Sequence, residues 1–415
     1  MPDPGLRTVA EHRAAVLALV APLPPVTVDV AEADDLVLAR EVRAPEALPR
    51  WDNSAMDGYA VRAADVAHAD AGPVTLAVLA DLPAGSAEEP EVTPGTAARI
   101  MTGAPLPPGA DAVVPVEQTD GGTRTVVVRA AAREGAHVRR AGEDVAAGEL
   151  VLPTGTLLGA PQVAAAAAVG CGTLAVHRRP RVAVLSTGSE LVPPGTPLRR
   201  GQIPDSNSHL LAAAARAAGC DVVRVGAVPD DGPTLRAVLD GLDRPDRADA
   251  RVDLVVTSGG VSMGAYDVVK EVLAGDAGMA FVRVAMQPGK PQGLGRLPGG
   301  TPVVALPGNP VSAWVSFQVF VRPALARLRG LPDAPDESTA AALEGWTTPP
   351  GRAQYLPVVL GEVPGGGVGV RPAVRGGSGS HLVAGLARAE ALAVVAADVD
   401  RVEPGDRVRL MRAGR

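Results

Sequence analysis

The chain of 415 residues is nearly devoid of lysine. Lys270 and Lys290 are the two lysines among 39 basic residues, and the rest are arginines. Aromatic side chains are also scarce, at 2%. Binding to a phosphate backbone requires clustered cations, and binding to single strands usually adds stacking aromatics. The sequence shows neither and has a net charge of −7, so we expect no nucleic-acid partner.

Cysteines and long apolar runs are lacking as well. Cys171 and Cys220 are too few for a disulfide framework and too far apart for a metal knuckle, which favours a reducing compartment. The apolar runs, such as residues 163–169, are far shorter than the roughly 20 residues that span a bilayer. The N-terminus has no basic-then-apolar signal pattern. We therefore expect a cytoplasmic protein without a membrane partner.

Glycine and proline are abundant, with 48 and 40 copies, and 47% of the residues are hydrophobic. Tight loops joined to cores of small apolar side chains are therefore expected. Thr8 and Glu11 have the spacing of a capping box, which predicts a helix that begins there. Short Val-rich runs between residues 51 and 152 alternate with turn signals and predict a small β-rich domain. We expect the side chains of Trp51 and Trp314 to pack in the interior.

Between residues 181 and 329, continuous apolar runs that end in Gly-rich turns alternate with helical patterns. Buried strands of this kind are typical of a parallel sheet covered on both faces. We predict an α/β multidomain protein with a central doubly wound parallel-sheet domain and smaller β-rich domains. The predicted domains are a linking domain of residues 1–50 and 138–178, a β-rich domain of 51–137, the sheet domain of 179–329 and a C-terminal β domain of 330–415.

The turns after four predicted strands read "STGSE", "PDD", "TSGGVS" and "LPGNPVS". The carboxyl ends of parallel strands meet at one crevice, where glycine amides and helix N-termini can bind an anion. Any doubly wound domain needs such turns, but four together favour a phosphate-bearing ligand. Glu190, Asp230 and Asp267 follow strand ends and could hold Mg²⁺ against a phosphate. Acids also favour loops and first helical turns, as we expect for Asp205 and Asp231.

Longer motifs identify a family. The segments "WDNSAMDGYAVR", "RIMTGAPLPPGADAVVPVE", "VRRAGEDV", "TSGGVSMGAYD", "QPGKPQG" and "LPGNPVS" resemble the molybdopterin molybdotransferases, the MoeA proteins of bacteria and the E domain of gephyrin. The resemblance implies an elongated homodimer of four-domain subunits. It also implies a reaction in which molybdenum from molybdate enters adenylylated molybdopterin with release of AMP, assisted by Mg²⁺.

The resemblance also assigns residues. The family's functional positions fall on Asp57, Thr102, Asp144, Glu190, Asp230 and Asp267, of which Glu190, Asp230 and Asp267 are the predicted Mg²⁺ ligands. The predicted substrate-binding residues are Ser186, Thr187, Gly188, Ser258, Gly259, Gly260, Ser262, Arg283, Gln287, Lys290, Pro307, Gly308, Asn309, Pro310 and Ser312. The site is expected to be completed across the dimer, with Asp57, Thr102 and Asp144 facing the partner's sheet domain.

Two positions depart from the family pattern, because bacterial relatives have lysines where this chain has Arg283 and Gln287. Arg283 keeps a cation, although its planar fork is not equivalent to an ammonium. Lys290 is retained, and we expect its compact ammonium to bind the tetrahedral molybdate anion. The alternative is that a lysine occurs at position 290 by chance and has no role in binding.

Three other functions are open to the sequence. A molybdopterin-adenylating enzyme would use a similar sheet domain, but normally without the "DNSAMDGYA" region. A catalytically weak molybdopterin-binding scaffold or paralogue would agree with the neutral Gln287, although the acidic positions are kept. A nicotinamide or flavin enzyme is disfavoured because no strand is followed by the dinucleotide glycine fingerprint.

Overall fold

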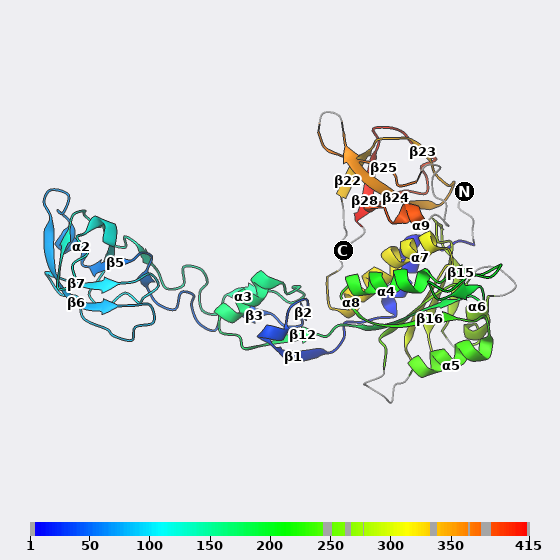
Figure 1. Ribbon diagram of the computed structural model, residues 1–415, viewed down its shortest axis with the longest axis horizontal. Coiled ribbons are helices and arrows are strands. Elements are labelled where there is room, and N and C mark those ends of the chain that lie inside the picture. The colour runs from blue at the N-terminus through cyan, green and yellow to red at the C-terminus, as the bar shows by residue number, and fades with distance from the viewer. Residues whose placement is uncertain are drawn as a thin grey trace. The chain divides into compact units, whose positions relative to one another are not determined.

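The computed structural model describes residues 5–243, 251–261, 267–276, 278–332, 338–363, 366–374 and 383–412. The chain forms two compact units (Figure 1). The first unit comprises Met1–Val26, Asp35–Ala39 and Val176–Arg415, and the second comprises Thr27–Asp34 and Arg40–Ala175. The predicted α/β fold with several sheets is confirmed, while the borders of four domains stay a prediction.

A six-stranded sheet of the first unit has the order β16-β13-β17-β21-β20-β18. Its strands are β13 (Arg181–Thr187), β16 (Asp221–Val228), β17 (Leu254–Ser258), β18 (Ala280–Arg283), β20 (Pro291–Arg296) and β21 (Pro302–Leu306). β13 pairs in parallel with β16 and β17, and β17 pairs in parallel with β21. Val182 and Val184 belong to one hydrophobic cluster, whereas Ala183 and Leu185 belong to another. Both faces of the sheet are therefore buried, as predicted.

The last two strands of this sheet differ from the prediction of a fully parallel sheet. β20 pairs antiparallel with both β18 and β21. Residues 297–301 join β20 to β21, and the Leu297 amide donates to the Thr301 carbonyl at 2.9 Å. A connection this short cannot make the crossover that a parallel pair requires. The sheet is consequently mixed, with its four parallel strands β16, β13, β17 and β21 side by side.

Helices cover both faces of the sheet (Figure 1). The helices packed in the cluster of Val182 are α1 (Val9–Ala18), α4 (Asn207–Ala217), α7 (Pro310–Ser316), the π-helix η3 (Phe317–Val321) and α8 (Arg322–Leu328). Those in the cluster of Ala183 are α5 (Gly232–Leu242) and α6 (Val268–Leu273). The capping box of α1 is confirmed, because Thr8 Oγ1 accepts from the Glu11 amide and Glu11 Oε2 accepts from the Thr8 amide.

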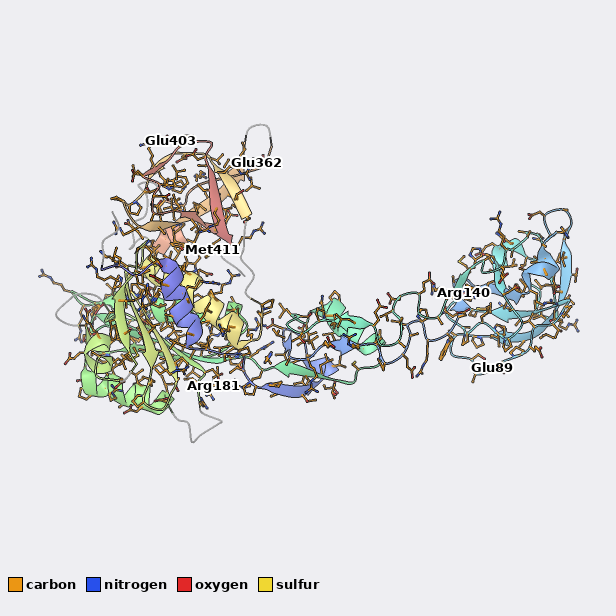
Figure 2. The ribbon with its side chains drawn as sticks, turned by 180° about the vertical axis from the view of Figure 1, so that it is seen from behind. Glu89, Arg140, Arg181, Glu362, Glu403 and Met411 are labelled. Atoms are coloured by element: carbon orange, nitrogen blue, oxygen red, sulfur yellow. The ribbon has the colours of Figure 1, made fainter. Side chains whose placement is uncertain are left out.

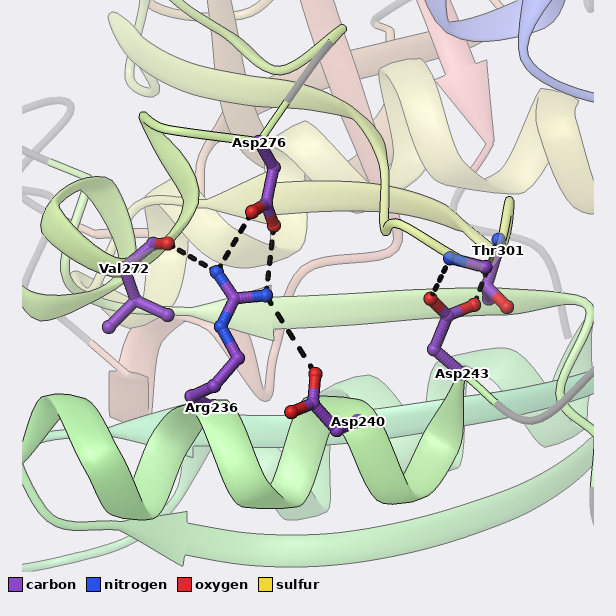
Figure 3. Close-up of polar contacts among 7 residues, drawn as sticks. Arg236, Asp240, Asp243, Val272, Asp276 and Thr301 are labelled. Atoms are coloured by element: carbon purple, nitrogen blue, oxygen red, sulfur yellow. Dashed lines mark hydrogen bonds and ion pairs between the residues drawn. The ribbon is translucent and has the colours of Figure 1, made fainter.

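Helix α5 is anchored along its length (Figure 3). Arg236 donates from both terminal nitrogens to the Asp276 carboxylate, at 3.0 Å each, and to the Val272 carbonyl at 2.5 Å. At the end of the helix, Asp243 accepts from the amides of Gly299 and Thr301 at 2.5 and 3.2 Å. These contacts attach α5 to α6 and to the turn before β21. They hold in place the helix that follows the end of β16.

His12 of α1 is fully buried, and its ring lies edge-on against Phe320 at 4.5 Å between centroids. Neither ring nitrogen has a hydrogen-bond partner among the described residues. Burial, with a smaller contribution from the Arg7 charge, lowers the pKa of His12 from 6.5 to about 4. Between these values the unfolded chain binds a proton that the folded chain excludes. Stability should therefore fall as the pH is lowered from about 6.5 to 4.

We expect this proton uptake to cost on the order of 3 kcal/mol of unfolding free energy across that range, from the shift of the His12 pKa. Urea denaturation at pH 7, 5.5 and 4.5 would measure it. His12→Leu should remove this part of the acid sensitivity, while carboxylates elsewhere continue to contribute. An equally steep loss of stability in His12→Leu would contradict the assignment.

The C-terminal part of the first unit contains a closed sheet. Its strands are β22 (Ser338–Ala342), β24 (Ala353–Glu362), β25 (Val368–Pro372), β26 (Ala391–Val395) and β28 (Arg407–Arg412). β24 pairs with both β25 and β26, so the ring β24-β25-β22-β28-β26 closes. Strand β19 (Met286–Gln287) adds to β24 in parallel. Figure 2 labels Glu362, the last residue of β24, and Met411 in β28.

The second unit contains a five-stranded sheet in the order β8-β5-β7-β6-β9. Its strands are β5 (Gly58–Val61), β6 (Val74–Leu82), β7 (Thr96–Ile100), β8 (Ala112–Pro115) and β9 (Thr125–Val128). The helices of this unit are α2 (Ala63–Val66), α3 (Ala160–Ala168) and the short η1 (Val30–Glu32) and η2 (Val116–Gln118).

Trp314 is buried as predicted, but Trp51 is 49% exposed, so its assignment to packing is wrong. The Arg50 guanidinium lies 5.9 Å from the centroid of the Trp51 ring.

The remaining elements are short. They are β1 (Pro25–Asp29), β2 (Val37–Leu38), β3 (Val42–Arg43), β4 (Asn53–Ser54), β10 (Val138–Arg139), β11 (Leu150–Leu152), β12 (Thr173–His177), β14 (Leu191–Val192), β15 (Ile203–Pro204), β23 (Trp346–Thr347), β27 (Arg401–Val402) and α9 (Val383–Leu386). Among the described residues, no helix has the length and apolar character needed to cross a membrane.

Candidate functional site

A cavity of about 820 Å³ opens at the carboxyl ends of β13, β16, β17 and β21. The predicted site residues that line it are Thr187, Gly188, Glu190, Asp230, Ser258, Gly259, Gly260, Pro307, Gly308, Asn309, Pro310 and Ser312. The four turns expected to converge therefore do so, because parallel strands place their carboxyl ends at one edge of the sheet. Asn309 and Pro310 occupy the N-cap and first position of α7, as the sequence predicts.

The backbone at this edge is packed too closely for larger side chains. Gly259 has φ +100°, and a Cβ placed on it would lie 2.6 Å from the Thr187 carbonyl oxygen. A Cβ on Gly308 would lie 3.4 Å from the Gly259 Cα. Glycine at position 259 is thus required for the turns of β13 and β17 to approach one another, whereas a Cβ on Gly308 would make an ordinary van der Waals contact. The resulting concave surface is lined by the glycine turns and leaves room for a ligand group close to the backbone.

Two carboxylates from neighbouring strands share this cavity. The turn after β13 and the turn after β16 are joined reciprocally, because the Ser189 amide donates to Asp230 Oδ2 at 2.9 Å and the Asp230 amide donates to Ser189 Oγ at 3.0 Å. The Glu190 carboxylate lies against Gly188, because a Cβ placed on Gly188 would lie 2.6 and 2.8 Å from the two carboxylate oxygens of Glu190. These contacts fix the backbone that carries both acids.

Asn207 is a lining residue that our sequence analysis missed. Its Nδ2 donates to Ser258 Oγ at 2.9 Å and to the Gly308 carbonyl at 2.7 Å. Ser258 Oγ in turn donates to the Pro307 carbonyl at 3.0 Å. The Ser258 proton is thereby used within the protein and its hydroxyl links two turns, while its predicted substrate-binding role stays a prediction. The "DSN" run could have drawn attention to Asn207, because Asn favours helix starts.

Unsatisfied polar atoms remain around the cavity. Thr187 and Asn207 are 6% and 8% exposed, and both line the cavity. Thr187 Oγ1 and Asn207 Oδ1 are buried without a hydrogen-bond partner in the described parts of the chain. Because Nδ2 of Asn207 faces a carbonyl, Oδ1 is fixed as a pure acceptor. Buried polar atoms in native proteins normally find partners, so a polar ligand is indicated.

The other predicted residues of this unit lie outside the cavity lining. Ser186 is buried, and one oxygen of Asp267, Oδ2, is buried without a partner among the described residues. Arg283 ends β18, Gln287 ends β19 and Lys290 directly precedes β20. Pro291, which follows Lys290, does line the cavity. Ser262 lies outside the described residues. Asp231 caps α5 through the Thr234 amide at 2.9 Å, and Asp205 accepts from the Ser208 amide at 3.1 Å, as we expected for both.

Comparison with known proteins identifies the family. Sequence models of the MoeA N-terminal region (domain I and II), a "Probable molybdopterin binding domain" and the MoeA C-terminal region (domain IV) match residues 7–170, 183–327 and 339–412. Molybdopterin molybdenumtransferase 2 of Mycobacterium tuberculosis is 47% identical over 413 residues, which cover 98% of this chain and 99% of that protein. The chain belongs to the MoeA family.

Other MoeA relatives agree along the whole length. Molybdopterin molybdenumtransferase 1 of Mycobacterium tuberculosis is 40% identical over 422 residues, which cover 97% of each chain. The crystal structure of the molybdopterin biosynthesis MoeA protein from Pyrococcus horikosii superposes with a TM-score of 0.82 at 31% identity and covers 98% of this chain and 99% of that one. The predicted family and the predicted class of enzyme, a molybdopterin molybdenumtransferase, are confirmed.

The MoeA motifs of the second unit form a small cluster of their own. Asp57 Oδ1 accepts from the Thr102 amide and from the Thr102 hydroxyl, both at 2.7 Å. These two hydrogen bonds hold the pKa of Asp57 below its usual value. Asp144 is exposed, and its amide donates to the Leu48 carbonyl at 3.0 Å. The structure therefore joins Asp57 to Thr102 and leaves both acids accessible.

No group of three or more His, Cys, Asp or Glu side chains within the described ranges is arranged to hold a metal ion. Glu190 and Asp230 line the same cavity, however, and the buried Asp267 Oδ2 has no partner in the described structure. Mg²⁺ in nucleotide enzymes is commonly bound through one or two carboxylates together with substrate phosphates. The donor set of the cavity fits an ion of that kind.

Proposed function

We propose that the protein transfers molybdenum from molybdate to adenylylated molybdopterin and releases AMP. The observation that carries the proposal is the cavity at the strand ends, where glycine turns, buried polar atoms and two carboxylates meet. Breaking a phosphoanhydride requires positioning and charge stabilisation more than covalent help from the protein. Family membership supplies the substrate class, and the two Mycobacterium tuberculosis relatives are both named molybdopterin molybdenumtransferases.

In this proposal the cavity binds the adenylylated molybdopterin. The turns containing Gly259 and Gly308 face its phosphates with a concave backbone, and the Thr187 hydroxyl, which has no partner in the described structure, is a proposed donor. Ser312 and the start of α7 add donors at the same edge. An oxygen of molybdate is the proposed nucleophile, and the bond that breaks joins AMP to the molybdopterin phosphate.

Glu190, Asp230 and Asp267 are the proposed ligands of Mg²⁺. Without a cation, their negative charges would repel a phosphoanhydride in the same cavity. When bound, the ion neutralises the charge of the pyrophosphate group. Glu190 and Asp230 bind and orient it from adjacent turns that Ser189 links.

Lys290 is the proposed molybdate-binding cation, with Arg283 and Gln287 on the same segment. Lys290→Arg should raise the KM for molybdate roughly tenfold, because a planar guanidinium cannot occupy the space of a compact ammonium. Initial rates of AMP release at varied molybdate would measure the change. A rate with the same molybdate dependence as the wild type would reject the role of Lys290.

We further propose a homodimer in which Asp57, Thr102 and Asp144 of one subunit complete the site of the other. Asp57→Asn and Asp230→Asn should each be nearly inactive alone. When the two variants are unfolded and refolded together, half of the dimers are mixed, and each mixed dimer has one intact site. About a quarter of the wild-type activity should return in this symmetric arrangement. A mixture that stays inactive, with dimers present, would show that each site is built from one chain.

The function is tested by AMP release from adenylylated molybdopterin, with molybdate and Mg²⁺ each added or withheld. Release that requires both supports the transferase and makes Gln287 a tolerated variation. Ligand that stays bound without release would favour the scaffold or paralogue. AMP release at the same rate with and without molybdate would contradict the proposed reaction.

A further inference from the structure

We infer that Gln292 is a positioning residue for molybdenum insertion, which fixes the loop that carries Lys290. The inference rests on the proposed function, since it concerns the same segment. Gln292 follows Lys290 by two residues, lies in β20 and is fully buried. Its side chain contacts both this loop and helix α7, so it connects the proposed molybdate-binding segment to the core.

The amide of Gln292 makes two short hydrogen bonds. Its Nε2 donates to the Gly289 carbonyl at 2.6 Å and to Ser316 Oγ at 2.7 Å. Ser316 is the last residue of α7, and its side chain is fully buried. A carbonyl can only accept, so the contact with Gly289 fixes which end of the amide faces the loop. Gln292 therefore holds the loop against α7 in one orientation.

Gly289 is the part of the loop that most needs such a contact. Its φ is +104°, and a Cβ placed on it would lie 2.8 Å from Ser316 Oγ and 3.4 Å from Gln292 Nε2. A glycine loses more conformational freedom on folding than any other residue and has no side chain with which to anchor itself. The hydrogen bond from Gln292 fixes the peptide group that directly precedes Lys290.

The first half of the loop is held by backbone contacts. The Arg7 amide donates to the Arg283 carbonyl and the Ala285 amide donates to the Arg7 carbonyl, both at 2.8 Å. The Ala353 amide donates to the Ala285 carbonyl at 3.0 Å, next to the pairing of β19 with β24. The second half has the bond from the Val284 amide to the Lys290 carbonyl at 2.7 Å, and Gln292 adds a side-chain anchor there.

A purely structural role would not require an amide at this position. Gln292 Oε1 is buried and has no partner among the described residues. Burying an unsatisfied acceptor is unfavourable, and an apolar side chain of similar volume would fill the same space without that cost. The chain therefore tolerates an unfavourable buried atom in return for an anchored Gly289.

The test compares Gln292→Met, which keeps volume and removes both hydrogen bonds, with Gln318→Met. Gln318 is a matched control, because it is a buried glutamine of η3 whose Oε1 also lacks a partner in the described structure. Gln292→Met should raise the KM for molybdate about tenfold and leave the KM for adenylylated molybdopterin within twofold, with only a modest loss of stability from the two lost hydrogen bonds. Gln318→Met should leave both KM values within twofold.

Calorimetric titration with molybdate alone separates this inference from the proposed reaction. Wild-type protein should bind molybdate, and Gln292→Met should bind it about tenfold more weakly even if no AMP is released. If Gln292→Met does not fold, Gln292→Asn, whose amide is one methylene too short to reach both partners, should show the same loss. Unchanged molybdate affinity in the folded variant, equal effects on both substrates, or no molybdate binding by the wild type would overturn the inference.

Discussion

Asp230→Asn is expected to slow AMP release by about two orders of magnitude, while Asp231→Asn leaves the rate within twofold. Both changes remove one negative charge from the same turn. Asp230 lines the cavity, and its Oδ2 accepts from the Ser189 amide at 2.9 Å. An asparagine oxygen can keep that hydrogen bond, so the loop should stay in place while the charge beside the phosphates is lost.

Asp231 provides the control because its role is local. Its Oδ2 accepts from the Thr234 amide at 2.9 Å as the N-cap of α5, and it does not line the cavity. Asparagine is an equally good N-cap residue. Steady-state AMP release at saturating substrates would measure both variants, with circular dichroism to confirm folding. Equal losses of activity in the two variants would mean that overall charge matters and that Asp230 has no special role.

Gly259→Ala should abolish detectable AMP release and destabilise the chain by about 2–4 kcal/mol. Gly259 has φ +100°, and the new Cβ would lie 2.6 Å from the Thr187 carbonyl oxygen and 2.9 Å from Thr187 Oγ1. The end of β17 would have to move away from the end of β13. That movement would change the width of the concave surface proposed to hold the phosphates.

Gly300→Ala separates backbone strain from this steric effect. Gly300 has φ +96°, and a Cβ on it would meet nothing within 4 Å. Alanine there should therefore cost about 1 kcal/mol and leave the rate of AMP release unchanged. Urea unfolding of both variants, combined with the AMP assay, would make the comparison. A Gly259→Ala protein as stable and active as Gly300→Ala would show that the turns need not approach so closely.

Much of the first unit could be predicted because its signals are local. The Thr8–Glu11 capping box, the Asn309–Pro310 helix start and the Gly-rich turns are each specified by neighbouring residues. Convergence of the four turns then follows from the geometry of parallel strands. For this reason most of the predicted sheet-domain residues are found in one cavity.

The features of the fold and the site that could not be predicted from the sequence depend on contacts between distant residues. The antiparallel pairing of β20 with β18 and β21 follows from connection lengths that apolar runs do not reveal. Asn207 contacts Gly308, and Gln292 contacts Ser316, across separations of 101 and 24 residues. Nothing in the local sequence distinguishes these amides from surface ones. The hydrogen bond from the Ser258 hydroxyl to the Pro307 carbonyl is likewise invisible in the local sequence.

The most direct measurement counts AMP and molybdenum in one reaction. Purified protein would be incubated with adenylylated molybdopterin, Mg²⁺ and molybdate, and the released AMP and the molybdenum bound to the pterin product would be quantified together. We expect one molybdenum inserted for each AMP released, with neither appearing when molybdate is withheld. AMP formed at the same rate without molybdate, or without molybdenum in the product, would contradict a molybdenum-transferring enzyme.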